Sequence, residues 1–282
     1  MSAPPTALAE PRPVTNDTGS PVIIFDQVSI SFEGNNVLNE ISFELQRGET
    51  RAIFGVAGSG KSTILKLALG LVKPDSGRIT VLGKEITGMR EEELFELRRQ
   101  IGMVFQESAL FDSLNVRDNV AFRLLEEGHA TEQEVDKPVR EALSFVELEN
   151  TIDLFPSELS GGMRRRVAIA RAIITHPEIL LYDSPTGGLD PVTSTTIIEL
   201  IVKQRDVAKT SALMVTHRLQ DAFMMATHYF DVKANAMQPL PRERRGEIPF
   251  AFMILRDGKI IFDGDLEQLV HAKDPYIQEY IS

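Results

Sequence analysis

The 282-residue chain can bury the core of one large domain or two modest ones, and 43% hydrophobic and 25% charged residues are typical of globular proteins. The formal net charge of −11 argues against a nucleic-acid partner, because nucleic-acid phosphates repel an acidic protein. The absence of cysteine excludes disulfides and thiolate chemistry and fits a cytosolic protein. No apolar run approaches the ~18 residues that span a bilayer, and the N-terminus lacks a secretion signal, so we expect any membrane role to come through a partner.

The N-terminal segment differs in composition from the rest of the chain. Residues 1–21 are rich in Pro, Ala and Thr without periodicity, which predicts a disordered leader, and residues 22–282 are expected to form a single domain. Residues 22–32 and 41–45 have the pattern of strands, and the polar, glycine-containing residues 33–36 predict the turn between them.

A glycine-rich loop follows the next predicted strand. Residues 51–54 have the apolar character of a buried strand, residues 55–63 read GVAGSGKST, and residues 64–69 read as an amphipathic helix. This context makes G-x-x-x-x-G-K-[ST] a nucleoside triphosphate site: Lys61 would reach the β- and γ-phosphates, and the Ser62 hydroxyl would ligate Mg²⁺. The predicted phosphate-binding residues are contiguous: Gly55, Val56, Ala57, Gly58, Ser59, Gly60, Lys61, Ser62 and Thr63.

The remaining elements alternate between strands and helices, which implies a mostly parallel sheet covered on both faces. Residues 91–99 predict a charged helix, and roughly residues 107–175 predict an inserted helical subdomain. Roughly residues 233–247 contain prolines and charges between two strand-like pieces (residues 229–232 and 251–255) and predict an exposed loop or hairpin insertion. Four further segments are predicted to be strands: residues 77–82, 101–105, 179–182 and 212–215.

The later motifs occur in a fixed order along the chain. Gln106 follows one predicted strand, residues 159–163 read LSGGM, Asp183 closes the apolar run ILLYD, and Asp190 and His217 end the runs GLD and TH. In these motifs the chain resembles the ATP-binding cassette (ABC) ATPases, over about residues 22–264. The resemblance implies an α/β fold, a P-loop NTPase (RecA-like) core with an antiparallel β subdomain and an inserted α-helical subdomain, with ATP and Mg²⁺ as cofactors.

The resemblance also implies a role for each residue near the nucleotide. Asp183, with Ser62, would hold Mg²⁺, because carboxylate and hydroxyl oxygens suit this ion. Gln106 would complete this metal site and orient water beside the ion, as its neutral side chain both donates and accepts hydrogen bonds. His217 would donate to the γ-phosphate, and Phe32 would stack on adenine, where the family more usually has Tyr.

The LSGGM segment implies a second cassette. Ser160, Gly161 and Gly162 open a helix and offer donors to an anion, although the chain already has one phosphate loop. By resemblance, this second cradle and Asp190 serve the nucleotide of an opposed subunit, which in a two-fold homodimer gives two composite sites. The following basic run, residues 164–166, is interpreted as a solvated or interdomain helix face.

Ser184 departs from the family pattern, which normally has Glu after the Asp at the end of this strand. Serine is too weak an acid to serve as the general base that polarises water, so we expect slow hydrolysis or a substitute group. Glu107 and Asp190 are the nearby carboxylates in motif terms. A homodimer would lose both bases, and a heterodimer only one.

Two segments indicate which group of ABC ATPases the chain resembles. Residues 106–120 (QESALFDSLNVRDNV) and 156–163 (PSELSGGM) look like the ATPases of Mla/Mce-type phospholipid transport systems. By resemblance, an integral-membrane permease would dock near residues 111–120, and the chain would be peripheral on the cytoplasmic face of a bacterial inner membrane. An importer ATPase for polar solutes such as amino acids, and a soluble or regulatory ABC ATPase with weak hydrolysis, remain alternatives.

Overall fold

The computed structural model describes residues 20–126, 131 and 134–281; most of the predicted leader (residues 1–21) therefore lies outside the described residues, and its last residue, Pro21, already belongs to a strand. The first strands form a four-stranded antiparallel sheet in the order β2-β1-β4-β5. Their side chains alternate between core and solvent, and Phe25 stacks on Phe43 across the β1–β2 pair at 4.7 Å. The bounds are β1 Pro21–Phe32, β2 Asn35–Gln46, β4 Ser76–Val81 and β5 Lys84–Glu85.

A six-stranded sheet lies at the centre of the molecule, in the order β12-β11-β3-β8-β7-β6. Five strands are parallel, and β12 is antiparallel at one edge. The inner strands are almost wholly apolar because both of their faces are buried, as β8 illustrates with five buried residues in a row. The bounds are β3 Thr50–Phe54, β6 Ile101–Val104, β7 Ile179–Asp183, β8 Ser211–Val215, β11 Phe250–Arg256 and β12 Lys259–Gly264.

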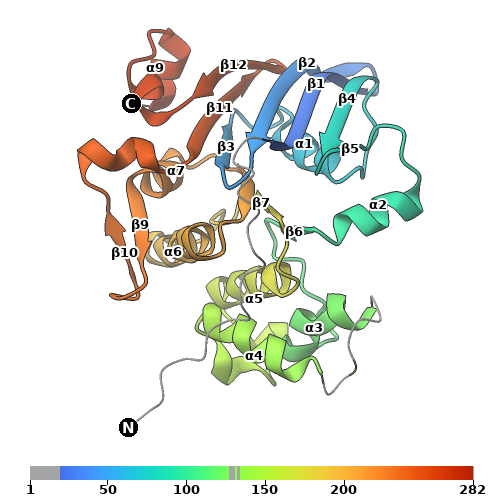
Figure 1. Cartoon of the computed structure of the whole chain (residues 1–282), viewed down its shortest axis with the longest axis vertical. Coiled ribbons are helices and arrows are strands. Elements are labelled where there is room, and N and C mark those ends of the chain that lie inside the picture. The colour runs from blue at the N-terminus through green and yellow to red at the C-terminus, as the bar shows by residue number, and fades with distance from the viewer. Residues whose placement is uncertain (1–19, 127–130, 132–133, 282) are drawn as a thin grey trace.

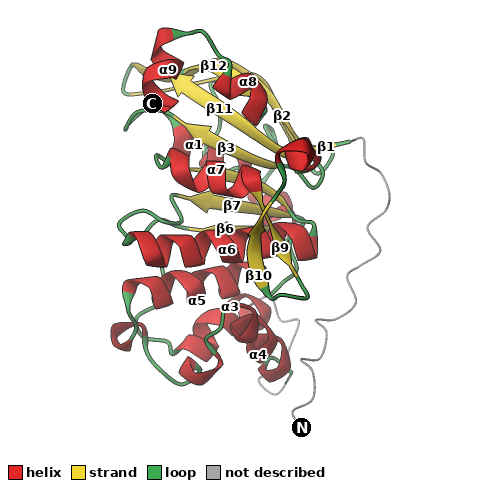
Figure 2. Ribbon diagram, turned by 90° about the vertical axis from the view of Figure 1, so that its left-hand side faces the viewer, coloured by secondary structure: helices red, strands yellow, loops and turns green. Residues whose placement is uncertain are grey.

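Helices cover both faces of this sheet and build a separate lobe. Figures 1 and 2 both place α3, α4 and α5 at one end of the molecule, away from the antiparallel sheet. These helices fall within residues 107–175, the range predicted for the inserted helical subdomain. The helices of this lobe are α3 Val116–Glu126, α4 Asp136–Phe145 and α5 Gly161–Ile173, with short 3-10 turns at Glu149–Thr151 and Pro156–Glu158. The other helices are α1 Lys61–Ala68, α2 Glu91–Arg98, α6 Pro191–Ala208, α7 Leu219–Thr227, α8 Leu266–Val270 and α9 Pro275–Ile281.

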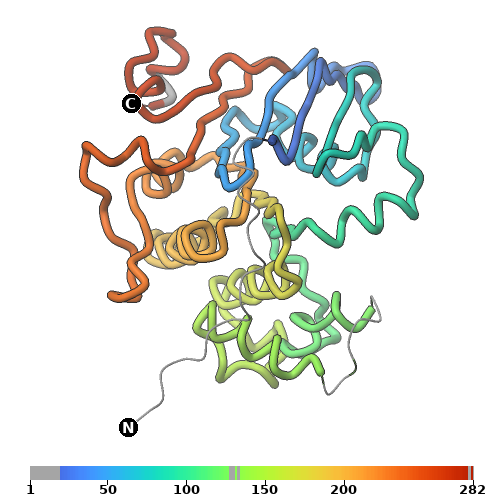
Figure 3. Tube along the Cα trace, viewed as in Figure 1, coloured from blue at the N-terminus to red at the C-terminus, as the bar shows by residue number. Residues whose placement is uncertain are grey.

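The segment around residues 233–247 forms a hairpin beside the main sheet. β9 (His228–Asp231) pairs with β10 (Ala236–Pro239), and a 3-10 helix spans Arg242–Glu247 before β11. The backbone N–H of Phe230 donates to Asp206 Oδ2 at 2.8 Å, which fastens the hairpin to α6. In Figure 3 this orange segment projects from the body of the molecule.

Two hydrophobic cores lie on opposite sides of the six-stranded sheet. Alternate residues of one strand serve different cores: Phe54 joins the core with α5 and α6, whereas Ile53 joins the core with α1 and the antiparallel sheet. The predicted fold class, a mixed α/β P-loop NTPase with an antiparallel subdomain, is confirmed. Among the described residues, no helix combines the length and the apolar character needed to cross a membrane.

Candidate functional site

The carboxyl ends of four neighbouring parallel strands meet at one edge of the central sheet. β3 and β7 flank β8, with Asp183 at the end of β7 opposite Val215 at the end of β8, and β6 lies beside β7. Segments that follow these strands leave at the same edge, where α/β sheets place their ligands. The structure therefore gathers the glycine loop after β3, Gln106 after β6, Ser184 after β7 and His217 after β8.

The glycine loop is pressed against neighbouring strands at two positions. A Cβ on Gly60, where φ is 94°, would lie 2.7 Å from Leu38 Cδ2 and 2.9 Å from the Val37 carbonyl oxygen of β2. A Cβ on Gly55 would lie 2.6 Å from the Leu255 carbonyl oxygen of β11. Only glycine allows these approaches, so the loop is held from behind by two strands. The residues at its crest are exposed: Val56, Ala57 and Gly58.

Lys61 opens α1 and folds its ammonium group back over this loop. Its Nζ donates to the carbonyl oxygens of Gly55 (2.9 Å) and Val56 (2.8 Å) and lies 3.3 Å from Ser59 Oγ. Burial lowers the pKa of Lys61, and the nearby Asp183 carboxylate opposes that change. A cation positioned at the mouth of the loop is the arrangement that phosphate binding requires.

Ser62 and Asp183, two of the three residues predicted for the metal site, are brought together although they lie 121 positions apart in the chain. Ser62 Oγ donates to Asp183 Oδ1 at 3.2 Å, at the start of α1 and the end of β7. Both groups are half-buried hard oxygen donors, which fit Mg²⁺, an ion that takes one or two protein oxygens and completes its shell with water and phosphate. Thr63, the next residue, is half-buried in the first turn of α1.

Ser184 occupies the position directly after the Asp183 carboxylate and is 7% exposed. Its φ of 47° is left-handed, and its backbone is held on both sides: the N–H donates to the Val215 carbonyl at 2.8 Å, and the carbonyl accepts from the Gly187 N–H at 2.9 Å. The backbone at this position is thus rigidly placed, but the side chain offers only a hydroxyl.

Gln106 and His217 follow the strands on either side of β7, and Gln106 lies beside Ser184. A Cβ built on Gly187 would lie 3.4 Å from Ser184 Cβ and 3.8 Å from Gln106 Cγ, so these two side chains border the same small space. Gln106 and His217 are both exposed, so their side chains are accessible to a ligand. Sequence and structure agree on their placement at the edge of the sheet.

Phe32 ends β1 and is 45% exposed. It pairs with Asn35 at the tip of the β1–β2 hairpin, two residues from Val37, whose carbonyl lies against the glycine loop. The structure therefore places an exposed aromatic ring at the tip of a hairpin whose second strand contacts the loop, and a base can stack on such a ring.

The LSGGM turn lies apart from the glycine loop of the same chain. Ser160 is the N-cap of α5 and its Oγ accepts from the Met163 N–H at 3.2 Å, while Ser160 and Gly161 are exposed. A Cβ on Gly162 would lie 2.4 Å from Thr193 Cγ2, so this glycine lets α5 pack on α6. Figures 1 and 2 both show α5 in the helical lobe and α1 toward the opposite end, so one chain does not bring the two predicted phosphate cradles together.

Asp190 caps α6. Its carboxylate accepts from the N–H groups of Val192 and Thr193, both at 3.0 Å, and from the Thr193 hydroxyl at 2.5 Å. The Thr193 hydroxyl, followed by the backbone donors, lowers the pKa of Asp190. This carboxylate is engaged by its own helix, which argues against it as a substitute base.

The three arginines of the basic run at residues 164–166, interpreted as a solvated or interdomain helix face, differ in exposure: Arg164 is exposed, Arg166 is half-buried and Arg165 is buried. Arg165 is 5% exposed, not part of a solvated face, because its guanidinium turns inward beneath the site. Arg171, in the same helix, bonds to the backbone of the segment after Gln106. The only sequence signal for these contacts was the i, i+3/i+4 apolar spacing of α5, which shows which face is buried but not that an arginine joins it.

A buried carboxylate that the sequence did not predict adjoins His217. Asp221 in α7 is 3% exposed and accepts a hydrogen bond from the buried Thr186 hydroxyl. Arg218 pairs with Asp221 at 3.4 Å and donates to Ser194 Oγ at 2.8 Å. Through these contacts α7, which follows His217, is bound to the segment after Ser184 and to α6.

The Asp221 carboxyl gives a pH prediction. Burial raises its pKa above the ordinary value of 3.8, against the opposing effects of the Thr186 hydroxyl, Arg218 and His217. As pH rises, the carboxyl of the unfolded chain therefore loses its proton before that of the folded chain. The contribution of Asp221 to the free energy of unfolding is complete below pH 3.8 and is lost as pH rises through the pKa of the folded state. Denaturant unfolding from about pH 4 to about pH 7 should show the wild type losing stability relative to Asp221→Asn; a pH-independent difference would contradict the assignment.

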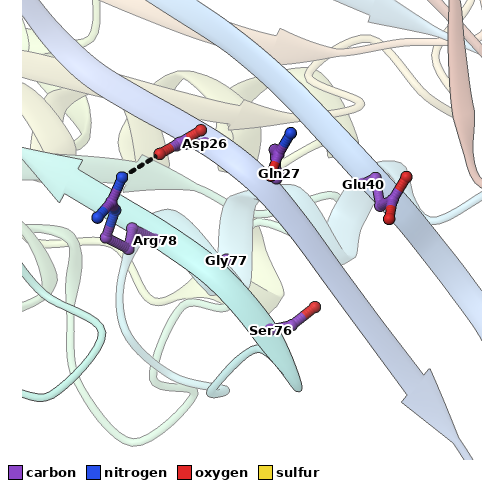
Figure 4. Close-up of a pocket in the computed structure, with 6 residues that line it drawn as sticks. All are labelled: Asp26, Gln27, Glu40, Ser76, Gly77 and Arg78. Atoms are coloured by element: carbon purple, nitrogen blue, oxygen red, sulfur yellow. Dashed lines mark hydrogen bonds and ion pairs between the residues drawn. The ribbon is translucent and has the colours of Figure 1, made fainter.

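A shallow surface pocket lies elsewhere, on the antiparallel sheet (Figure 4). It is bordered by an exposed ion pair between Asp26 and Arg78 at 2.7 Å, and Gly77 packs its Cα side against the backbone of Gln27. The residues that line it contribute nothing to the edge where the predicted site residues gather: Asp26, Gln27, Glu40, Ser76, Gly77 and Arg78.

Comparison with known families agrees with this geometry. The profile of the ABC transporter family matches residues 38–187, more than half of the chain. The chain belongs to this family. The match begins in β2, includes the glycine loop, Gln106 and the LSGGM turn, and ends just after Ser184, and the predicted resemblance to ABC ATPases is confirmed.

Two relatives point to different cargoes. The intermembrane phospholipid transport system ATP-binding protein MlaF of Escherichia coli (strain K12) is 32% identical over 260 residues, which cover 92% of this chain and 88% of that protein. The methionine import ATP-binding protein MetN of Bifidobacterium longum is 38% identical over 206 residues, 71% of this chain but only 51% of that protein. The family is therefore established, and the cargo is not decided by identity alone.

A solved structure of similar fold is a dimer. This dimeric ATP-binding cassette, in a post-hydrolysis state with ADP and Pi bound, matches with a TM-score of 0.72 and 29% identity, over 86% of this chain and 98% of that chain.

Proposed function

We propose that this chain is the subunit that binds and hydrolyses ATP to energise a membrane ABC transporter. The observation that carries the proposal is the meeting of Lys61, Ser62 and Asp183 at the carboxyl edge of the parallel sheet. A loop of backbone N–H groups, one cation and two oxygen ligands is the set that a nucleoside triphosphate and its metal need.

Each site residue has a role in this proposal. Lys61 exchanges its carbonyl contacts for β- and γ-phosphate oxygens, and Phe32 stacks on adenine. When bound, Mg²⁺ neutralises phosphate charge, and Ser62 and Asp183 would hold it. Gln106 orients water and His217 donates to the γ-phosphate. Ser184 cannot accept the proton of attacking water at neutral pH, so we expect slow turnover in the wild-type chain.

A second cassette would complete the site. The exposed Ser160–Gly162 turn lies apart from the glycine loop of its own chain and presents helix N-terminal donors to solvent. In a two-fold homodimer this turn, with Asp190 beside it, would face the nucleotide on the opposed loop, giving two equal composite sites. The dimeric form of the similar cassette supports this assembly.

The permease would dock at the segment that follows Gln106. Phe111 is exposed and its ring packs on Phe122 of α3 at 4.4 Å, so an apolar surface is presented near residues 111–120. The chain would then sit peripherally on the cytoplasmic face of a bacterial inner membrane.

We infer that the cargo is phospholipid moved between inner and outer membranes, which rests on the similarity to MlaF over almost the whole of both chains. The similarity to MetN keeps import of a polar solute such as an amino acid as the second candidate. A third candidate is a regulatory cassette with weak hydrolysis, because Ser184 stands where a general base is expected.

Purification from membranes in mild detergent separates these functions. A co-purifying multispan protein, reconstituted with the chain, should show ATP-dependent movement of labelled phospholipid. Uptake of labelled methionine without lipid movement would instead support the importer. A chain that binds ATP but associates with no membrane protein would support the regulatory reading.

A further inference from the structure

Helix α5 carries a buried arginine directly beneath the site. Arg165 Nη1 donates to the carbonyl oxygens of Phe105 (3.1 Å) and Ser184 (3.3 Å), and its Nη2 donates to the Gly187 carbonyl (3.3 Å). One guanidinium thus joins the residue before Gln106, the residue after Asp183 and the turn that leads to Asp190.

A second arginine of α5 holds the next part of the same segment. Arg171 Nη1 and Nη2 donate to the carbonyls of Ala109 and Ser108, both at 2.8 Å. Ser108 and Ala109 have left-handed φ angles of 64° and 47°, an unfavourable conformation that persists only where surroundings enforce it. The guanidinium of Arg171 also lies 6.0 Å from the Phe111 ring. We call residues 105–111 the Gln106 loop.

Burying the charged guanidinium of Arg165 costs free energy, which an apolar side chain that only filled the space would avoid. Burial lowers the pKa of Arg165, and among the described residues Glu107 is the carboxylate that opposes this change. Its Nε has no hydrogen-bond partner among the described residues. A planar fork can reach three carbonyls that diverge from separate loops, whereas a lysine ammonium on a flexible stem cannot hold all three.

We infer that Arg165 and Arg171 are positioning residues that fix the Gln106 loop relative to Ser184 and Gly187. The helix that carries them begins at the Ser160–Gly162 turn, which the proposed dimer presents to the opposed nucleotide. A movement of α5 at one composite site is therefore transmitted to Gln106 and Ser184 of the other. This inference rests on the proposed ATP hydrolysis and on the proposed dimer.

The test compares Arg165→Gln, Arg165→Lys and Arg171→Gln with the matched control Arg166→Gln. Arg166 lies on the same helix but donates to the Val146 carbonyl, outside the site. Hydrogen exchange of the Gln106 loop and of residues 184–188 is measured with kcat, KM and the Kd for ATP. If the wild-type chain hydrolyses too slowly to measure, all variants are built on Ser184→Glu.

We expect Arg165→Gln to speed exchange in both segments and to lower kcat roughly 10-fold, with the Kd for ATP within about twofold, because small displacements of reacting groups slow the chemistry. Arg171→Gln should speed exchange in the Gln106 loop alone, Arg165→Lys should restore part of the protection, and Arg166→Gln should change neither segment. Unchanged exchange in Arg165→Gln overturns the inference whatever the activity. Faster exchange with unchanged kcat also overturns it, as does equal disturbance by Arg166→Gln.

Failure of the proposed function is seen separately. It would appear as loss of ATP hydrolysis in both the wild-type chain and Ser184→Glu, while hydrogen exchange still reports whether the arginines hold the loop.

Discussion

Replacing Ser184 by glutamate is expected to raise the kcat for ATP hydrolysis on the order of 10²-fold, the lower end of what a general base contributes. The backbone at this position is already held by Val215 and Gly187, so a longer side chain would leave from a fixed point beside Gln106. Two neighbouring carboxylates are otherwise engaged: Asp183 accepts from Ser62, and Asp190 caps α6. Phosphate release by the purified chain measures the effect.

The control for this substitution is Ser184→Gln. Glutamine has the volume of glutamate and pays the same left-handed backbone cost, but it cannot accept a proton at neutral pH. Turnover should stay near the wild-type level in Ser184→Gln, with ATP affinity similar in all three proteins. Rapid turnover by the wild type, with no gain from Ser184→Glu, would show that another group such as Glu107 acts as the base.

Lys61→Ala is expected to weaken ATP binding roughly 10²-fold, because each hydrogen bond to a charged group contributes about 1.5–3 kcal/mol and Lys61 would contact two phosphates. The variant also loses the bonds that Nζ makes to the Gly55 and Val56 carbonyls in the free chain. Calorimetric titration with ATP and Mg²⁺ measures the affinity, and light scattering should show loss of ATP-driven association of two chains.

Lys66→Ala is the matched control for this loss. Lys66 lies on the same helix, five residues further along, with an exposed side chain. The Lys66→Ala substitution removes the same charge from α1 without changing the loop. A similar fall in ATP affinity would therefore mean that net charge, not the position of Lys61, governs binding.

The local motifs predicted the site because they are contiguous or end a recognisable strand. The glycine loop carries its own geometry in nine residues, since glycine alone permits its turn and its close approach to β2 and β11. Asp183 was predicted because an apolar run of β7 stops at a carboxylate, and parallel strands end at one edge of a sheet. The pattern of apolar and polar residues similarly predicted the strands of the sheet that separates the two cores.

The arginines of α5 illustrate what local pattern misses. Arg164, Arg165 and Arg166 look alike in sequence, yet only Arg165 lies beneath the site, with carbonyl partners from positions 105, 184 and 187. The pairing of Asp221 with Thr186 was missed for the same reason, since the hydrogen-bond partner of a buried polar group can come from any part of the chain.

Residue types at short spacing were therefore enough to predict the family and the glycine loop, and to raise the expectation that Ser184 leaves the site without a general base. The tertiary structure decided that Ser62 reaches Asp183, that Arg165 joins three loops, and that the Ser160–Gly162 turn lies apart from its own glycine loop. These are contacts between distant segments, and they arise only when burial of the two cores brings the strand ends and α5 to one edge of the sheet.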